Sequence, residues 1–173
     1  KCLFTEEFNT PCPFPSVSTR CPVYSAEGGW RGWFFKGRNG CIWNGPAWPF
    51  ANSMILDGLA KESRKRNHRW DEKFATYFMK FTEMHYNGGD GTIPYLVEHY
   101  NSMTGECISD DVDYSHSYYI DLIVSYVAGL IIKPGKIEVD PLELGLKRFR
   151  LSNIYVQGHT IEICLEENGK FSL

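Results

Sequence analysis

Three stretches of the chain repeat hydrophobic residues at the spacing of an α-helix. Residues 49–66 start with a proline, which a first helical turn tolerates, and end in basic residues, which suit a helix C-terminus. Residues 69–89 have the clearest pattern, with two acidic residues in the first turn and an Asn-Gly pair as a stop signal. Residues 115–131 form the third stretch, with Ser115 as a candidate N-cap. The predicted apolar faces are Phe50, Met54, Ile55 and Leu59 in the first helix, Trp70, Phe74, Tyr77, Phe78, Phe81 and His85 in the second, and Tyr119, Leu122, Ile123, Tyr126 and Leu130 in the third.

After residue 133 the hydrophobic period changes from helical to alternating. Residues 136–142, KIEVDPL, predict a short strand, and residues 149–166 predict two strands joined by a tight turn at Gln-Gly-His. The final GKFSL sequence adds one more short strand. The order of elements therefore predicts a helical part over residues 1–132 and a small β module over residues 133–173. Three helices with broad apolar faces are too few to cover one another, which fits a fragment of a larger helical layer.

The first 47 residues are rich in Pro, Gly, Ser and aromatic side chains and show no sustained period. A long stretch without regular structure inside a compact domain is usually functional. Residues 26–40 have the glycines of a hairpin. The chain starts without Met, without a basic region and without the apolar core of a signal peptide. It therefore reads as part of a longer protein, so its compartment is open, and a periplasmic or extracellular location is compatible with it.

Composition narrows the class of partner. The net charge of −3 provides no basic footprint for nucleic acid, and no apolar run is long enough to span a membrane. Aromatic residues make up 15% of the chain, which suits a sugar-binding surface or a tightly packed core. The six cysteines lack the spacing of a zinc site, so no metal and no cofactor is expected, and both disulfides and free thiols remain open.

Two loops carry the candidate chemistry. The sequence CIWNGPAWPFANS places two tryptophans on a loop that opens a helix, where a core, a protein partner or a flat ligand must cover them. Residues 90–117 gather carboxylates that suit acid/base chemistry or calcium, although the strict order of a calcium loop is missing and a solvated acidic loop is the alternative. Glu98 differs from its neighbours because apolar and aromatic residues flank it, which can tune its proton affinity. An edge glutamate facing solvent is the other reading.

Both loops resemble sequence elements of a known clan of enzymes. IWNGPAWPFANSMILDGLAK is similar to the W-x-G-P-x-W element of (α/α)6-toroid glycoside hydrolases, the clan of trehalases, processing α-glucosidases and mannosylglycerate-hydrolase-like enzymes. VEHYNSMTGE resembles the E-x-Y-x-x-x-T-G element that follows in that clan. The next helix and a hairpin resemble the exit into the β module of bacterial members. The match keeps the clan's order over residues 41–165.

The resemblance implies a fold and a mechanism. The fold would be mainly α with a small β appendage, namely a partial (α/α)6 toroid of three or more helices followed by a short antiparallel β module. Glu98 matches the general base of an inverting hydrolase. Such an enzyme also needs an acid roughly 6.5–9.5 Å away. The clan's acid is an Asp upstream of the W-x-G-P element, and no residue of this chain occupies that position.

The same resemblance implies a set of substrate contacts on the two loops. The expected partners are an oligosaccharide and the missing N-terminal part of the same polypeptide. Asn44 departs from the clan, since several relatives have Arg there, so a bidentate grip on the substrate and trehalose-like specificity are in doubt. Trp48 is alternatively a staple for the helix start, and His116 a helix cap. The expected substrate-binding residues are Trp43, Asn44, Trp48, Tyr100, Asp113 and His116.

Three functions follow as alternatives. The first is a segment of a glycoside hydrolase that is inactive as this chain alone. The second is a non-catalytic carbohydrate-binding or scaffolding module that keeps the toroid elements. The third is a toroid lyase, which would need a Tyr or His base and a basic patch, and the mild acidity of the chain disfavours it.

Overall fold

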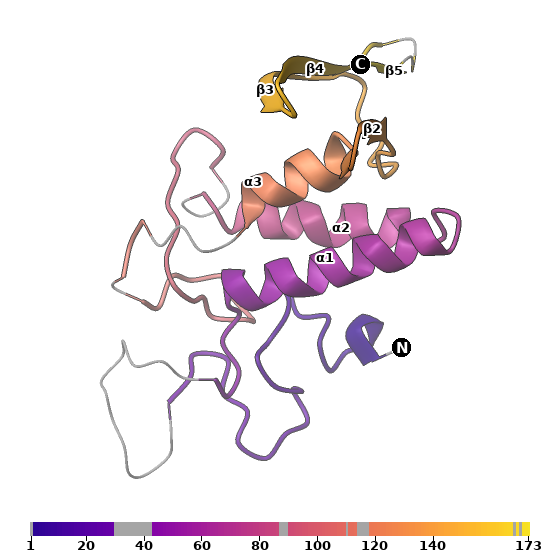
Figure 1. Ribbon diagram of the computed structural model, residues 1–173. Coiled ribbons are helices and arrows are strands. Elements are labelled where there is room, and N and C mark those ends of the chain that lie inside the picture. The colour runs from indigo at the N-terminus through magenta and orange to yellow at the C-terminus, as the bar shows by residue number, and fades with distance from the viewer. Residues whose placement is uncertain are drawn as a thin grey trace. The chain divides into compact units, whose positions relative to one another are not determined.

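The computed structural model describes residues 2–29, 43–86, 90–109, 111–113, 118–167, 169 and 171–173. A short 3-10 helix, η1 (Cys2–Phe4), precedes a long irregular segment. The α-helices are α1 (Pro49–Lys65), α2 (Asp71–Glu83) and α3 (Tyr119–Leu122), and two small antiparallel sheets follow them (Figure 1). The strands are β1 (Leu130–Lys133), β2 (Lys136–Val139), β3 (Phe149–Val156), β4 (His159–Leu165) and β5 (Phe171–Ser172).

The predicted fold class, a mainly α partial (α/α)6 toroid, is wrong. The described residues form a small mixed α/β structure that contains helices α1 to α3 and two small antiparallel sheets. Most of residues 2–29 and 90–113 lies in turns, bends and isolated bridges rather than in helices. Proline and glycine recur in both segments, and each interrupts helical hydrogen bonding.

The third predicted helix is much shorter than expected. After four residues α3 widens into a π-helix, η3 (Ile123–Val127), and the Ala128 N–H donates to the Ile123 carbonyl at 2.8 Å. Gly129 follows with φ of +80°, and a Cβ there would lie 2.2 Å from the backbone nitrogen of Pro141. The backbone reverses at this glycine, so Leu130 starts strand β1 instead of a further helical turn. A short apolar run fits a buried strand as well as a helix, and periodicity alone does not separate the two.

Helix α1 begins where the proline predicts, but its buried face differs from the prediction. Met54 is 60% exposed, whereas Asn52 is fully buried. The Asn52 side-chain oxygen accepts the Phe14 N–H at 2.7 Å, and its amide donates to the Trp48 carbonyl at 2.9 Å. A buried amide with both groups bonded ties the N-terminal loop to the helix at little cost. Helix α2 follows its prediction more closely, with Phe74, Tyr77, Phe78 and Phe81 all buried.

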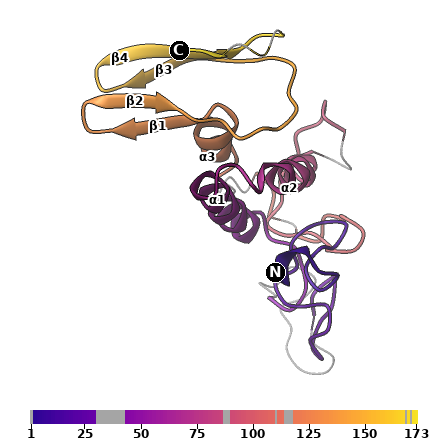
Figure 2. The same ribbon diagram turned by 90° about the vertical axis from the view of Figure 1, so that its right-hand side faces the viewer.

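The two hairpins confirm the predicted β pattern. Gln157 and Gly158 both have positive φ, as a two-residue turn between twisted strands requires, and Val156 pairs with His159 across it. Strand β1 pairs with β2, and the second sheet has the order β3-β4-β5. The β1–β2 and β3–β4 hairpins run alongside one another in Figure 2. Their shared core is built on Ala128, Leu130 and Ile163, with Val124, Ile137, Val139, Phe149, Leu151, Ile154 and Ile161 packed against it.

The chain divides into two compact units. Unit 1 comprises Lys1–Leu56 and Thr76–Tyr118, and unit 2 comprises Asp57–Ala75 and Tyr119–Leu173. The predicted domain division at residues 132 and 133 stays a prediction. In unit 1 the irregular segments are held by isolated antiparallel bridges. The bridges are Pro15–Ala47, Ala47–Tyr100, Tyr86–Pro94, Val97–Val112 and Tyr100–Cys107.

In unit 2 a buried carboxylate joins several segments. Asp71, which is 5% exposed, accepts hydrogen bonds from the Ser63 hydroxyl at 2.6 Å and from the Glu143 N–H at 2.7 Å. His68 lies with Nδ1 at 2.9 Å from Asp71 and Nε2 at 3.1 Å from Asp140. Bonds to a charged acceptor are the stronger kind, so this cluster fastens the α1–α2 turn to the chain that follows β2.

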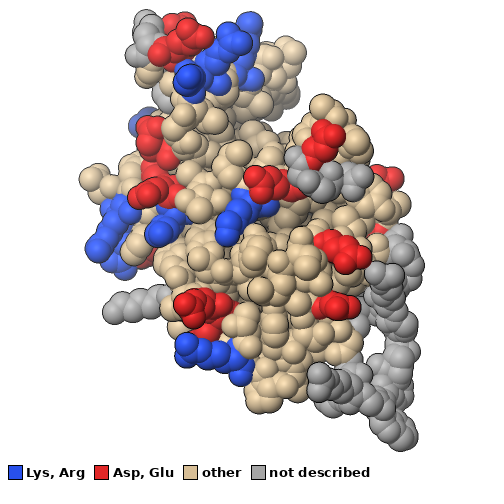
Figure 3. Space-filling model, turned by 180° about the vertical axis from the view of Figure 1, so that it is seen from behind, with Lys and Arg blue, Asp and Glu red and all other residues tan. Residues whose placement is uncertain are grey.

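Among the described residues, no helix has the length and apolar character needed to cross a membrane. Basic and acidic side chains are interspersed on the face shown in Figure 3. The described cysteines, Cys2, Cys12, Cys21, Cys107 and Cys164, are free thiols.

Candidate active site

The two candidate loops meet through backbone pairing within unit 1. Ala47 and Tyr100 exchange both N–H···O bonds at 2.9 Å, the narrow pair of an antiparallel ladder. On the other side of the same segment, the Glu98 N–H donates to the Asp111 carbonyl at 3.2 Å. The segment with Glu98 therefore runs between the tryptophan loop and residues 107–112, which fixes its backbone from both edges.

The tryptophan loop turns at Gly45 for a steric reason. Its φ is +151°, and a Cβ at this position would lie 2.0 Å from the Ser25 carbonyl oxygen. The neighbouring Asn44 donates through its amide to the Val23 and Gly29 carbonyls at 3.0 and 2.9 Å. Asn44, expected to contact substrate, thus ties this loop to the N-terminal segment with both of those hydrogen bonds.

Three flat rings form a stack that we call the aromatic column, made of Trp43, Trp48 and His99. The Trp43 and Trp48 rings lie 4.3 Å apart at 8°, and the Trp48 and His99 rings lie 4.8 Å apart at 22°. Exposure falls along the column, from 49% at Trp43 to 3% at Trp48 and 0% at His99. Trp43 is consequently the ring with a face open to solvent, and Trp48 connects it to the buried imidazole.

Glu98 lies beside the buried end of the aromatic column. The residue is 6% exposed, and its Oε2 is 3.6 Å from His99 Nδ1. Burial lowers the pKa of His99, against the opposing effect of the negative charges of Glu98 and Asp111. The imidazole is therefore neutral at neutral pH. A carboxylate held in such a setting can remove a proton from a water molecule.

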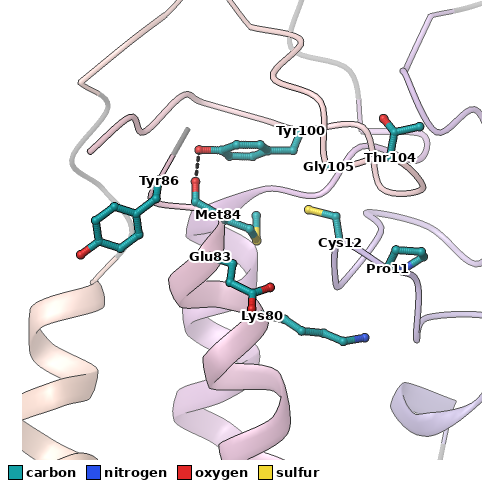
Figure 4. Close-up of a pocket in the computed structure, with 9 residues that line it drawn as sticks. All are labelled: Pro11, Cys12, Lys80, Glu83, Met84, Tyr86, Tyr100, Thr104 and Gly105. Atoms are coloured by element: carbon teal, nitrogen blue, oxygen red, sulfur yellow. Dashed lines mark hydrogen bonds between the residues drawn. The ribbon is translucent and has the colours of Figure 1, made fainter. Parts of the chain in front are cut away.

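Tyr100 has its hydroxyl engaged inside the protein. The hydroxyl donates to the Met84 carbonyl and accepts the Val97 N–H at 3.1 Å. Burial raises the pKa of Tyr100, so the phenol stays protonated. Its ring lines a cavity of about 230 Å³ together with Cys12 and Lys80 (Figure 4). The pKa of the Cys12 thiol is raised to about 12, mainly by burial, which makes the thiol a poor nucleophile.

Asp113, another predicted contact, is exposed and has a φ of +56°, in the left-handed region. His116 lies outside the described residues, as does most of the predicted hairpin over residues 26–40. Among the described residues, no group of three or more His, Cys, Asp or Glu side chains could hold a metal ion.

His99 is a residue of the site that the sequence pattern does not single out. It follows Glu98 directly, but its ring stacks on Trp48, about fifty positions earlier in the chain. Alternation in an extended segment places neighbouring side chains on opposite faces, which argues against a contact between Glu98 and His99. The pairing of Ala47 with Tyr100 is what brings the two loops into register.

The geometry thus combines a buried carboxylate, that of Glu98, with a stack of aromatic rings whose outer member, Trp43, is about half exposed. The model of one protein family matches residues 1–117, and its description is the mannosylglycerate hydrolase MGH1-like glycoside hydrolase domain. The chain belongs to this family, and its function is of the glycosidase type. The match includes the aromatic column and Glu98, and it confirms the resemblance to mannosylglycerate-hydrolase-like enzymes. No curated protein and no solved structure matched the chain.

Proposed function

We propose that the chain is the base-carrying part of an inverting glycoside hydrolase, with Glu98 as the general base. Support comes from one observation above all, the burial of this carboxylate beside the aromatic column. In an inverting reaction the carboxylate removes a proton from water as the water attacks the anomeric carbon. A second carboxylic acid protonates the leaving oxygen. We assign that acid to a segment upstream of these residues in the same polypeptide, so the chain alone is expected to be inactive.

The substrate is an oligosaccharide or a glycoside of the mannosylglycerate kind, in keeping with the family description. We assign the stacking contact with the sugar ring to Trp43, because about half of its surface is open. Trp48 has its faces engaged by two neighbouring rings, so it supports Trp43 from beneath. Tyr100, Asp113, Asn44 and His116 remain candidate substrate contacts.

The base role is tested by Glu98→Gln in the full-length polypeptide that carries this chain. General acid–base catalysis contributes about 10²- to 10⁴-fold, so kcat on mannosylglycerate and on related glycosides should fall by that amount while sugar binding is retained. Glu106→Gln is the matched control, since Glu106 is an exposed carboxylate on the same loop. Product analysis by NMR should show inversion at the anomeric carbon. A Glu98→Gln variant within threefold of the parent rate would remove Glu98 from the base role.

The stacking role is tested in the 173-residue chain by titrating sugar against tryptophan fluorescence or by calorimetry. Trp43→Ala should raise the Kd by about 3- to 10-fold, because an aromatic contact is worth about 0.5–1.5 kcal/mol beyond area burial. Met54→Ala removes a side chain of similar exposure on α1 and should leave the Kd unchanged. Sugar binding without turnover in the full-length protein would favour a carbohydrate-binding module. An unchanged Kd in Trp43→Ala would exclude the assigned contact.

A further inference from the structure

The imidazole of His99 is a polar ring buried without ordinary hydrogen bonding. Its exposure is 0%, and within the part of the chain that the structure describes neither ring nitrogen has a hydrogen-bond partner. Buried polar groups in folded proteins are nearly always paired, so an exception calls for a physical reason. One acceptor lies close by, since Glu98 Oε2 is 3.6 Å from Nδ1, slightly beyond hydrogen-bond distance.

The plane of the imidazole is set by the aromatic column. The ring lies nearly parallel to Trp48, with the two centroids 4.8 Å apart, so tilting the imidazole out of this plane would break the stack. Trp48 follows Ala47, whose two backbone bonds to Tyr100 anchor the loop one residue away from each ring. Within this plane, Nδ1 lies 3.6 Å from Glu98 Oε2, so the edge of the ring that carries Nδ1 faces the carboxylate.

The protonation state follows from the surroundings. Burial lowers the pKa of His99 even though Glu98 and Asp111 act in the opposite direction, so the neutral ring carries one N–H. With the proton on Nε2, the lone pair of Nδ1 would face the carboxylate oxygen and the two would repel. With the proton on Nδ1, the ring donates toward Oε2, and hydrogen bonds of this kind often shorten only when substrate is bound.

We propose that His99 is the positioning residue of Glu98: a neutral imidazole with its proton on Nδ1, clamped by Trp48, that directs the carboxylate of Glu98 by donating to Oε2. This inference rests on the proposed function for its catalytic meaning, but its tautomer is a property of the folded chain alone. The aromatic column then has two ends with separate tasks. Trp43 meets the sugar, and His99 orients the base.

The first test measures the tautomer in the 173-residue chain from the ¹⁵N chemical shifts of the imidazole nitrogens. The expected result is a protonated Nδ1 and an unprotonated Nε2 at neutral pH. In Glu98→Leu, which removes the acceptor, the proton should move to Nε2, the tautomer that free histidine prefers. A wild-type ring protonated on Nε2 would overturn the inference, as would a Glu98→Leu variant that keeps the proton on Nδ1.

The second test measures turnover in the full-length polypeptide. His99→Phe keeps a flat ring against Trp48 but removes the donor, and kcat should fall about 10- to 100-fold, the scale of a misplaced catalytic group, with KM within twofold. His99→Asn retains a donor near the Nδ1 position and should recover much of that loss. His159→Asn, an exposed hairpin substitution, is the control and should change neither constant. A His99→Phe variant at the parent rate would indicate a purely structural ring, and a His99→Asn variant no more active than His99→Phe would show that the donor is not what matters; either result would contradict the inference.

The two proposals fail in distinguishable ways. Undiminished turnover in Glu98→Gln would reject the base role, whereas the tautomer measurement would still report whether His99 donates to that carboxylate. An inactive Glu98→Gln together with a ring protonated on Nε2 would reject only the role of His99. If His99→Phe does not fold, the wild-type and Glu98→Leu spectra decide the question.

Discussion

Deleting the hydroxyl of Tyr100 offers a sharp test of how unit 1 is assembled. Tyr100→Phe removes one oxygen from a residue that is 2% exposed. In the structure this oxygen accepts the Val97 N–H and donates to the Met84 carbonyl. Both partners are backbone groups, so the hydroxyl joins the end of α2 to the segment that carries Glu98.

The expected cost follows from those two contacts. A buried backbone group left without its partner costs about 1–3 kcal/mol, and the slightly more apolar phenylalanine ring offsets part of that. We therefore expect a loss of about 2–4 kcal/mol in the free energy of unfolding. For a chain of this length that loss corresponds to a fall in Tm of about 5–12 °C. It is a large part of the total stability of an ordinary domain.

Urea denaturation followed by circular dichroism gives the measurement. Tyr155→Phe makes the same chemical change at a residue that is 74% exposed, and it should stay within about 0.5 kcal/mol of the parent. A Tyr100→Phe variant as stable as Tyr155→Phe would refute the reasoning. If that variant instead lost sugar affinity at full stability, the hydroxyl would belong to the substrate site.

Two further predictions concern unit 2. Gly129→Ala should lower the free energy of unfolding by more than about 2 kcal/mol in urea denaturation, because positive φ is strained for alanine and the new Cβ would strike Pro141. Gly145→Ala is the control, since Gly145 has a φ of +69° with open space around it and therefore tests the backbone strain alone. Equal losses in the two variants would contradict the clash. Burial lowers the pKa of His68, but the hydrogen bonds and charges of Asp71 and Asp140 together outweigh it, and the net pKa is raised. A raised pKa stabilises the fold below the ordinary value of 6.5, and this stability is lost as the pH rises through the folded-state pKa. Between pH 6 and pH 8 the free energy of unfolding of the wild type should thus fall by up to about 1 kcal/mol relative to that of His68→Gln. The effect is small because water screens the His68 side chain, which is 36% exposed. Equal pH dependence of unfolding stability in the two proteins would contradict this prediction.

Local signals along the sequence predicted several elements correctly. Helix α2 has acidic residues at its start and a stripe of aromatics, and both the helix and most of its buried face are found as expected. The turn of the β3–β4 hairpin has positive φ at both Gln157 and Gly158, and glycine adopts this conformation without steric cost. Such features depend on residues within a few positions of one another.

Where long-range contacts decide the outcome, the same signals mislead. The periodicity of α1 favours Met54 as buried, but Asn52 is buried instead because Phe14, far earlier in the chain, supplies its hydrogen-bond partner. The third helix lacks its last predicted turn because Gly129 reverses the backbone and Leu130 pairs with Val139 in a hairpin. Strand pairing therefore uses residues that their spacing alone would assign to a further helical turn.

Part of the candidate site could likewise be predicted from local sequence, and part of it depends on long-range contacts. The residue types and order around Trp43 and Glu98 were sufficient to indicate a glycoside hydrolase, because those short elements lie intact within the sequence. Stacking of His99 on Trp48 and its approach to Glu98 arise only when Ala47 pairs with Tyr100. A contact between segments fifty residues apart leaves no period in either of them, so only the folded chain reveals it.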